Sequence, residues 1–391
     1  MEKLILLWEA YNLRLFARIK IRMNVIKNGA VAVGTALVLS ALQVQAEVKW
    51  DISADAMLDA TSYRGYLFPS DSQEAYLRRA KAAAKFEFSP LVSAKMSVEY
   101  DYDKALTVDD FYLLVNPAKD YGIYLGKFKE PSGLAKSGSL KAQTFTERSI
   151  ATNIFSFGRK SGAKLAANGG FWAAEAAVMQ AEADEAGVDD GRVTAFKATV
   201  NPYRSENKKA FAHLGVSYSQ RDSTERRFDL NEPMLVPTLG NLLRSPNYDA
   251  ERIATTSVEF AAAYKKWLFQ TEHYQQGIDE FDGDEYQHSG YYASLSWAIK
   301  GKSREYRGGK IKLANKNKPL VELALRVSEV DMRERNDGDK AEVFTASANY
   351  YFKQHYRVVL EYEFAERERH DDGFVTLTDG DAVKARFQIN F

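Results

Sequence analysis

The sequence predicts an all-β fold, a transmembrane antiparallel β-barrel of about sixteen strands. Three observations support this prediction. Apolar and polar residues alternate with a period of two through almost the whole chain after residue 46, as expected of strands with one apolar and one polar face. The connections between these segments alternate between short and long, and the N-terminal segment is typical of an exported protein.

The composition excludes several classes of protein and of site. The 391 residues include 53 Lys and Arg, 53 Asp and Glu, and no Cys. A disulfide framework and a Cys-ligated metal site are therefore excluded. No stretch after residue 46 approaches the ~20 apolar residues of a membrane-spanning helix. A soluble protein and a membrane β-barrel remain, and only the second escapes detection by hydropathy.

The N-terminus predicts export. Residues 23–46 contain Lys27, an apolar run from Ala30 to Leu42 and a small-x-small cleavage site that ends at Ala46. This pattern is typical of a secretory signal peptide, and the apolar run is too short for a membrane anchor, the alternative interpretation. Residues 1–22 resemble an upstream extension. We therefore expect residues 1–46 to be removed by cleavage after Ala46, and residues 47–391 to form an outer-membrane barrel.

Strand segments follow one another along the rest of the chain. In one of them, Val321, Leu323, Leu325 and Val327 alternate with Glu322, Arg326 and Ser328. Each segment is close to the ~9 to 11 residues that a tilted strand needs to cross a bilayer. The predicted strands are 48–60, 76–88, 92–103, 107–116, 121–129, 159–167, 171–181, 191–200, 209–220, 252–264, 267–277, 289–299, 319–330, 341–352, 356–366 and 381–391.

The connections provide an independent test of the barrel. Those after strands 2, 4, 6, 10 and 14 are tight, whereas those after strands 1, 5, 9 and 15 are long. Tight turns at one end and long loops at the other are typical of outer-membrane barrels with periplasmic termini. Two connections break the rule: the one after strand 3 is short, and residues 300–318, after strand 12, form a long connection at the tight-turn end.

The last strand carries an end signal. Residues 381–391 read DAVKARFQINF, and every second residue from Val383 to the terminal Phe391 is apolar. A terminal aromatic residue on an alternating strand resembles the signal that outer-membrane assembly machinery recognises. The alternative is that this segment is a strand of a soluble sandwich. Such a sandwich would have sixteen strands with an exposed apolar face and unpaired sheet edges, whereas a closed barrel in lipid has no unpaired edge.

Several segments in order resemble the phosphate-selective porin O and P family. They are Gly126 to Leu134 with Phe145 to Ser149, Asn201 to Tyr203 with His213 to Gly215, Tyr291 to Tyr306, Val321 to Ser328, Asn349 to Phe352, and Arg386 to Gln388. The resemblance covers most of the chain after residue 46. It implies a trimeric sixteen-stranded channel whose inward-folded third loop narrows the pore and whose Arg and Lys side chains select anions.

Two departures from the family pattern concern the substrate. Ile299 to Lys302 replaces an acidic Leu-Thr-Gly-Glu pattern, and Pro131-Ser132 lacks the aromatic residue that often follows the proline. Phosphate or polyphosphate is nevertheless the best substrate that the resemblance suggests.

Positive charge is concentrated in two of the connections between the predicted strands. Residues 130–160 carry a net charge of +3 and residues 300–318 a net charge of +7, although the chain after residue 46 is net negative. Cations along a low-dielectric pore raise the local concentration of anions. The residues that we expect to line the pore are Arg148, Lys141 and Lys136 at the constriction and Arg79, Lys81, Lys85, Arg326 and Arg386 on the strands. The basic stretch 300–318 could equally be a solvated loop.

Other functions remain possible. Lumen-facing Glu87, Glu99, Asp101, Glu322 and Glu361 could cancel the positive field and give a non-selective diffusion porin, and long loops such as 221–251 could serve a structural or adhesive barrel. The five His residues form no catalytic motif, so we expect no enzyme and no cofactor. Asp282 to Glu285 lacks the ligand spacing of a calcium loop, and we expect no metal site. The expected partners are small inorganic anions, outer-membrane lipid and lipopolysaccharide, and two further copies of the chain in a homotrimer, with no nucleic acid.

Overall fold

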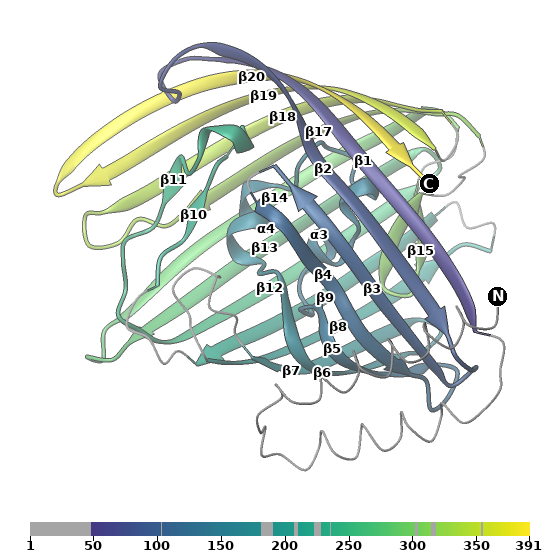
Figure 1. The fold of residues 1–391 in the computed structure, drawn as a ribbon. Helices are drawn as coiled ribbons and strands as arrows, with labels where there is room; N and C mark the ends of the chain where they lie inside the picture. The colour runs from purple at the N-terminus through teal and green to yellow at the C-terminus, as the bar shows by residue number, and fades with distance from the viewer. Residues whose placement is uncertain are drawn as a thin grey trace, which may run out of the picture. The chain divides into compact units, whose positions relative to one another are not determined.

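The computed structural model describes residues 48–102, 104–180, 191–206, 210–222, 228–234, 236–301, 304–313, 318–352 and 355–391. The expected signal segment, residues 1–46, lies outside these residues. Sixteen antiparallel strands close into one barrel in the order β1 to β9, β12 to β14 and β17 to β20 (Figure 1), which confirms the predicted fold and strand number.

The bounds of the barrel strands are close to the predicted segments. They are β1 Lys49–Arg64, β2 Ser72–Glu87, β3 Val92–Asp101, β4 Lys104–Val115, β5 Tyr121–Lys129, β6 Arg159–Asn168, β7 Trp172–Gln180, β8 Arg192–Arg204, β9 Ala210–Asp222, β12 Ala250–Tyr264, β13 Trp267–Glu280, β14 Glu285–Lys300, β17 Leu320–Asp331, β18 Gly338–Phe352, β19 Tyr356–Asp371 and β20 Phe374–Asn390.

The barrel is apolar outside and polar inside. On β17, Leu323, Leu325 and Val327 are 41–51% exposed, whereas Glu322 and Arg326 on the other face are at most 5% exposed. Apolar side chains that point outward are stable only against lipid, and closure of the sheet leaves no backbone edge to be solvated there. The period-two pattern of the sequence therefore maps directly onto the two faces of the wall.

A bulge changes this alternation on β2. The pairing of β1 with β2 shifts register between Met57, which pairs with Arg79, and Leu58, which pairs with Leu77. Arg78 is the extra residue, and both Arg78 and Arg79 are buried. A bulge places two residues opposite one and re-aims a side chain, so two adjacent arginines enter the interior.

Several strands extend beyond the predicted segments at the long-loop end. The predicted long connection after strand 15 is wrong: β19 and β20 are joined by Asp372 and Gly373 alone. The connection between β1 and β2 also shortens, to residues 65–71. Both faces of residues 366–371 carry charged side chains. The hydrophobic alternation that marks a strand in lipid is therefore absent there, although the backbone pairing of β18 with β19 continues to His370.

Three connections contain secondary structure of their own. Residues 130–158, the third loop, contain the helices α3 (Leu134–Ser137), η1 (Leu140–Ala142) and α4 (Ile150–Phe155). Residues 223–249 include β10 (Asn231–Glu232), η2 (Pro237–Leu239) and β11 (Leu243–Arg244), and the connection from β14 to β17 contains a hairpin of β15 (Arg304–Arg307) and β16 (Lys310–Leu313).

These connections pack against the inner wall. Ile154 and Phe155 of α4 share one apolar cluster with Leu243 of β11 and with Tyr274 and Val330 of the wall. Apolar contacts of this kind exclude water and hold the connections in place. Among the described residues, no helix has the length and hydropathy needed to cross a bilayer.

Candidate functional site

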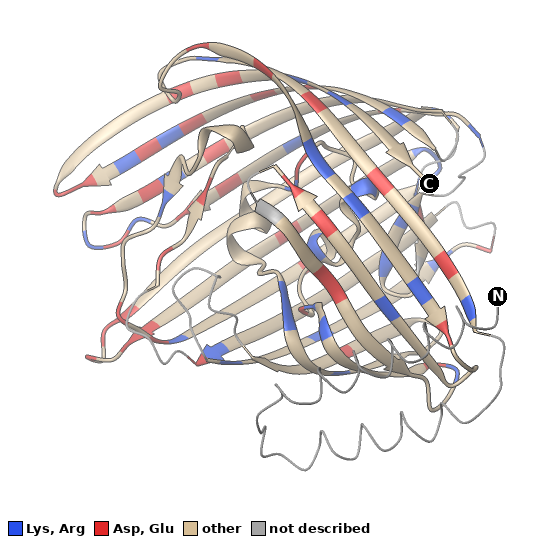
Figure 2. Ribbon diagram, in the orientation of Figure 1, with Lys and Arg blue, Asp and Glu red and all other residues tan. Residues whose placement is uncertain are grey.

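A polar cavity of about 680 Å³ lies between the inner faces of β1 to β7 and the connections that pack inside the barrel. Eleven Lys or Arg residues and seven Asp or Glu residues line it. The basic residues are Arg78, Arg79, Lys81, Lys95, Lys129, Lys136, Lys141, Arg148, Arg159, Lys164 and Lys310, and the acidic residues are Asp55, Glu99, Asp101, Asp110, Glu147, Glu175 and Glu232. Figure 2 shows mainly acidic positions along β1 and mainly basic positions along the neighbouring strand β2.

Ion pairs connect the strand residues of the cavity wall. Arg79 lies 3.2 Å from a carboxylate oxygen of Asp55 and 3.0 Å from one of Glu99. On the next strands, Lys95 and Arg159 each lie 2.6 Å from Asp110. Because these carboxylates are neutralised within the wall, the strands alone give the cavity little net charge.

The bulge residue Arg78 joins the wall to the third loop. Its guanidinium pairs with Asp101 of β3 and, at 2.9 Å, with Glu147 of the third loop. The two nearby guanidinium groups, Arg78 and Arg386, hold the pKa of the Glu147 carboxyl well below its usual range, although burial opposes them. Glu147 is therefore an anchor for the loop and is ionised at neutral pH.

Two cations at the third loop, Arg148 and Lys129, contact main-chain oxygens, whereas Lys141 of the same loop lies 3.8 Å from Asp55. Arg148 donates hydrogen bonds to the main-chain oxygens of Ala135 and Gly138, at 3.2 and 3.3 Å. Lys129, at the end of β5, donates to the main-chain oxygens of Lys136 and Gly138. Burial, with repulsion by Arg79 and Arg159, lowers the pKa of Arg148 to about 10, so it keeps its charge at neutral pH. A carbonyl oxygen orients a cation without cancelling its charge.

Aromatic side chains form another part of the cavity wall. Tyr112, Tyr124 and Phe128 all line the cavity. The Tyr112 and Tyr124 rings lie 5.2 Å apart, and the ammonium group of Lys164 lies 4.5 Å from the centre of the Tyr124 ring. Tyr112 pairs directly with Gly126, which has no side chain, so the rings can approach one another across this position.

Polar side chains of the wall bind the backbone of the third loop. Glu272 of β13 accepts a hydrogen bond from the Ala135 amide at 2.7 Å, and Glu361 of β19 accepts one from the Thr146 amide at 3.0 Å. Arg357 donates to the Thr144 oxygen at 2.7 Å and Arg326 to the Glu147 oxygen at 2.9 Å. The loop is thus tied to β13, β17 and β19 by buried groups, and each unpaired buried group would be costly.

The predicted pore residues fall into two groups. Arg148, Lys141, Lys136, Arg79 and Lys81 all line the cavity. The other three do not. Lys85 is half-exposed at the tight-turn end of β2 and pairs with Glu87, whereas Arg326 and Arg386 are buried beneath the third loop and donate to its carbonyl oxygens. Strand alternation identifies an inward position but does not indicate whether another segment covers it.

Six basic residues of the cavity are not among the individually predicted pore residues, although two of them, Arg159 and Lys310, belong to the two basic connections of the sequence. Arg78 follows from the bulge, and the adjacent pair of arginines was the one signal for it. Lys95 and Lys164 stand on inward positions of predicted strands and could have been found by alternation. Lys129, Arg159 and Lys310 depend on where the third loop and the β15–β16 hairpin fold, which no local pattern encodes.

Glu232 is the titratable acid of the cavity. It lies on β10 and accepts a hydrogen bond from the Asn153 side chain at 2.8 Å. Burial raises the pKa of the Glu232 carboxyl to about 7, because the charged form loses its hydration, and the hydrogen bond from Asn153 only partly offsets this. The charge of the cavity therefore changes in the physiological pH range.

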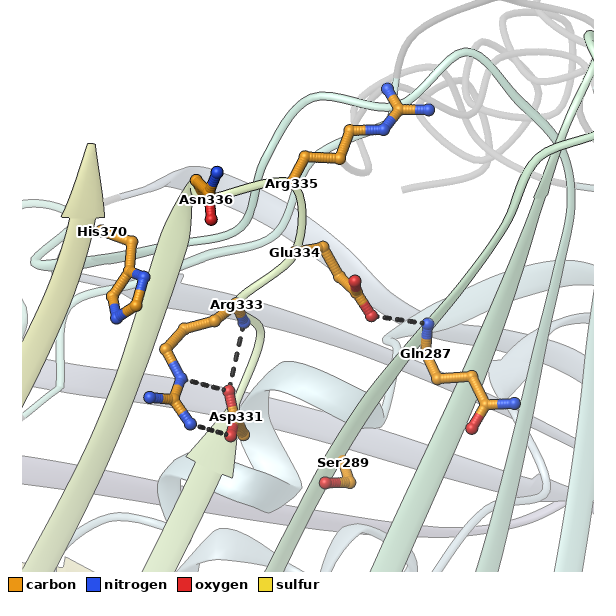
Figure 3. Close-up of a pocket in the computed structure, with 8 residues that line it drawn as sticks. All are labelled: Gln287, Ser289, Asp331, Arg333, Glu334, Arg335, Asn336 and His370. Carbon is orange, nitrogen blue, oxygen red and sulfur yellow. Dashed lines mark hydrogen bonds and ion pairs between the residues drawn. The ribbon is translucent and has the colours of Figure 1, made fainter. Parts of the chain in front are cut away.

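A second hollow of about 400 Å³ lies at the long-loop end and includes the outward-facing Gln287 and Ser289 (Figure 3). Two of its charged side chains, Arg333 and Asp331, lie 2.6 Å apart, and Arg333 also lies 2.7 Å from Glu368, outside the hollow. The Glu334 carboxylate accepts a hydrogen bond from the main-chain N–H of Gln287 at 3.2 Å. This arrangement stabilises the connection between β17 and β18.

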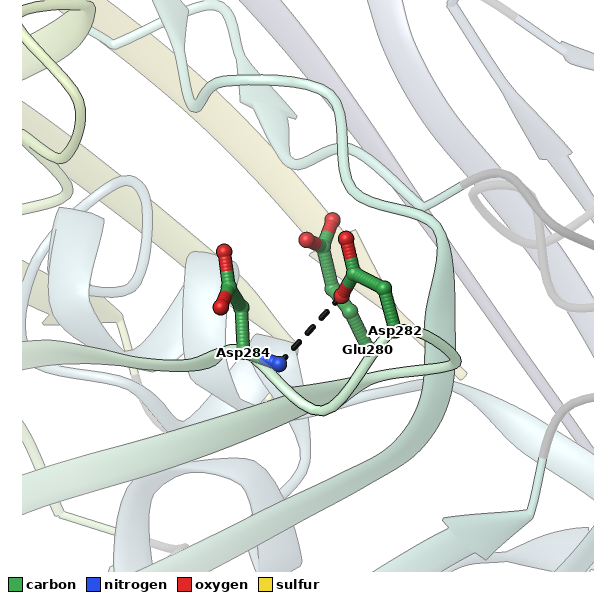
Figure 4. Close-up of side chains that lie close together, drawn as sticks. All are labelled: Glu280, Asp282 and Asp284. Atoms are coloured by element: carbon green, nitrogen blue, oxygen red, sulfur yellow. Dashed lines mark hydrogen bonds between the residues drawn. The ribbon is translucent and has the colours of Figure 1, made fainter.

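Three carboxylates gather at the turn between β13 and β14. Ligand atoms of Glu280, Asp282 and Asp284 lie within 4.8 Å of one another (Figure 4). Arg335 lies 2.5 Å from Glu280 and 3.2 Å from Asp284, so an internal cation already offsets their charge. The cluster is a surface turn with a basic partner.

The comparisons with known proteins agree with this architecture. The model of the phosphate-selective porin O and P family matches residues 51–391. An uncharacterized protein of Caulobacter vibrioides is 21% identical over 345 residues, which cover 81% of this chain and 68% of the relative.

Solved structures show the same fold at low sequence identity. The anion-selective porin from Comamonas acidovorans has a TM-score of 0.56 at 10% identity, over 88% of this chain and all of that chain. The outer membrane channel DcaP of Acinetobacter baumannii has a TM-score of 0.55 at 12% identity, over 88% and 99% of the two chains. OmpT of Vibrio cholerae in its trimer form has a TM-score of 0.55 at 10% identity, over 88% and 100%. The chain therefore belongs to the phosphate-selective porin O and P family and is a porin of the Gram-negative outer membrane.

Proposed function

We propose that the protein is a passive channel for small anions, with phosphate or polyphosphate as the preferred substrate, and that the cavity is its selective section. The observation that carries the proposal is the distribution of charge. Six of the seven carboxylates of the cavity are ion-paired. Eleven basic side chains face seven acidic ones, so the cavity as a whole carries an excess of positive charge, to which Arg148 of the third loop and Lys310 of the β15–β16 hairpin contribute; Lys141 of the third loop lies 3.8 Å from Asp55.

The third loop narrows the passage in this proposal. Its backbone is held by buried side chains of β13, β17 and β19, and its cations line the cavity that remains beside β1 to β7. Cations fixed in a low-dielectric constriction raise the local anion concentration and repel cations. Several closely spaced cations also allow an anion to move from one to the next, since no single site binds it too tightly.

A bilayer recording tests the proposal. The purified protein is inserted into a planar bilayer with a KCl gradient, and the reversal potential is measured with and without phosphate. We expect a reversal potential of the sign that chloride permeation gives, and a concentration-dependent reduction of the chloride current by phosphate. Weak selectivity would support a non-selective diffusion porin, and absence of conductance would support a structural or adhesive barrel.

We further propose that the protein is a homotrimer in contact with lipopolysaccharide. The trimer form of the structurally similar OmpT from Vibrio cholerae and the apolar outer face of this barrel support the assembly. Chemical cross-linking in outer-membrane vesicles should yield a ladder that ends at three copies. A ladder that ends at one or two copies would contradict the trimer.

A further inference from the structure

We propose that the β15–β16 hairpin acts as a support that fixes the third loop, and that Arg304 is its positioning residue. This inference rests on the proposed function, because it concerns what holds the constriction in shape. The hairpin belongs to the long connection at the tight-turn end of the barrel, whereas the third loop enters from the opposite end. The two segments meet inside the barrel.

The guanidinium group of Arg304 joins three parts of the molecule. It forms an ion pair with Glu322 of β17 at 2.7 Å and a hydrogen bond to the Tyr351 hydroxyl of β18 at 3.1 Å. It also donates to the Ala142 main-chain oxygen at 2.8 Å and to the Thr144 hydroxyl at 3.1 Å, both in the third loop. Its side chain is only 3% exposed, so these contacts are shielded from water.

A second polar path runs from the hairpin to the same loop. The Tyr306 hydroxyl lies 2.9 Å from Nδ1 of His213, whose Nε2 lies 2.9 Å from Glu259. Lys197 lies 3.0 Å from Glu259 and donates to the Ser132 main-chain oxygen at 2.7 Å. This path ends ten residues before Ala142, so the hairpin is connected to both sides of the segment between them.

Apolar packing completes the contact. Leu134 of α3 shares a buried cluster with Phe211 and Tyr306, and Ile311 of β16 packs against that cluster. At the tip of the hairpin, a Cβ placed on Gly309 would lie 3.5 Å from the Cβ of Ala173 on β7. The hairpin therefore reaches from β14 and β17 to the wall near β7 and β8, and the third loop rests on it.

Position rather than charge is the expected contribution of Arg304. Its charge is balanced by Glu322 at close range, and Arg304 is absent from the residues that line the anion cavity. If the guanidinium group of Arg304 is removed, the Glu322 carboxylate stays buried without its cation, and the segment from Ala142 to Thr144 loses the hydrogen bonds that hold it. If the third loop moves, the passage becomes wider and the cations of the loop no longer keep fixed positions along it.

Single-channel recording of four variants tests the inference. Arg304→Met removes the charge and the contacts, whereas Arg304→Lys keeps the charge but cannot reproduce the planar donor pattern. Tyr306→Phe removes only the hydroxyl of the second path and should fold even if the Arg304 variants do not. Lys312→Met is the matched control, because Lys312 is an exposed cation of the same hairpin. The wild-type permeability ratio of anions to cations is the reference.

We expect both Arg304 variants to raise the open-channel conductance about twofold, increase the current noise and lower the anion-to-cation permeability ratio by about threefold or more. Tyr306→Phe should change all three in the same direction by less, and Lys312→Met should resemble the wild type. An Arg304→Lys channel identical to the wild type would overturn the inference, as would a Tyr306→Phe channel without any change if the Arg304 variants do not fold.

A cross-link adds a rescue experiment. The chain has no Cys, so Ala173→Cys with Gly309→Cys introduces a single disulfide at a Cβ separation that disulfides adopt. Gly309 has a φ of +69° and its Cβ would lie 3.1 Å from the Thr199 hydroxyl, so the same two cysteines in a chain that keeps Arg304 are the control for local strain. In the Arg304→Met background, oxidation should restore low noise and selectivity, and reduction should abolish the rescue. Failure of the oxidised, cross-linked channel to recover would contradict a positioning role. If the wild type itself is not anion-selective, the proposed function fails, whereas conductance and noise still test the support role.

Discussion

Arg386 of the last strand forms a two-point ion pair with Asp59 of the first strand, with both nitrogen–oxygen distances at 2.7 Å. Both side chains are at most 2% exposed. The pair joins the two ends of the sheet, where β1 pairs with β20. The same guanidinium group contacts Glu147 at 2.7 Å, so closure of the barrel and placement of the third loop share one residue.

Replacing Arg386 should therefore weaken the closed barrel. Arg386→Met leaves Asp59 and Glu147 buried without this partner, and we expect a loss of about 3–5 kcal/mol of unfolding free energy. Urea unfolding in detergent, followed by tryptophan fluorescence, measures the loss. Arg64→Met is the control, because Arg64 also bridges β1 and β20, to Asp381, but its side chain is 74% exposed. Equal losses in the two variants would contradict this explanation.

Arg148, one of three cavity-lining cations of the third loop, should control selectivity. Arg148→Glu reverses the charge of a residue that lines the cavity and donates to the main-chain oxygens of Ala135 and Gly138 in the loop. We expect the anion-to-cation permeability ratio in a KCl gradient to fall by about fivefold or more. Arg192→Glu, an exposed position at the start of β8, should leave the ratio unchanged. A selectivity that survives Arg148→Glu would place the selective section elsewhere.

Selectivity should also depend on pH through Glu232. Its pKa is raised to about 7 by burial, so the carboxyl is mostly neutral at pH 6 and mostly ionised at pH 8. The cavity is thus more positive at low pH, and the anion-to-cation permeability ratio should fall as the pH rises through about 7. Reversal potentials at several pH values should show this for the wild type. Glu232→Gln should give a shallower profile with the higher ratio at pH 8, and an unchanged slope in that variant would assign the effect to another group.

Replacing an outward-facing residue with arginine should show whether that position contacts lipid. Leu325, in the middle of β17, is 51% exposed, and Leu377, on β20, is 76% exposed. Arg at Leu325 would lie in lipid and should cost about 2–4 kcal/mol of folding free energy. At the long-loop end, the pairing of β20 with β1 stops at Asp381, and Leu377 lies four residues further toward the tip of the β19–β20 hairpin. We expect this tip to lie outside the lipid, so Leu377→Arg should be tolerated. Refolding into lipid vesicles compares the two variants, and equal tolerance would argue against lipid contact at Leu325.

Processing of the N-terminus is a separate prediction. Residues 1–46 lie outside the described part of the chain, and the sequence predicts cleavage after Ala46. N-terminal sequencing of the protein from purified outer membranes should therefore begin at Glu47. A start before residue 24 would show that the predicted signal segment is retained.

Local sequence was sufficient for the wall of the barrel. The alternation that gave the faces of β17 and of residues 381–388 of β20 holds residue by residue, because lipid on one side and water on the other impose opposite polarity on successive positions. The extension of β19 and β20 over residues 367–380 was missed because charged side chains on both faces of residues 366–371 break the apolar–polar alternation. There the strands are held by backbone pairing, which leaves no hydrophobic pattern to detect.

The sequence by itself determined the fold class, the number of strands and the inward position of residues such as Arg79, Arg326 and Arg386. Only the tertiary structure decided which of these cations line the cavity and which hold the third loop. The physical reason is that the polarity of each strand residue depends only on whether its side chain faces lipid or the barrel interior. Whether an inward side chain can be reached from the passage depends instead on where the third loop and the β15–β16 hairpin fold. These segments come from opposite ends of the barrel and meet through Arg304, a contact between residues 160 positions apart in the chain.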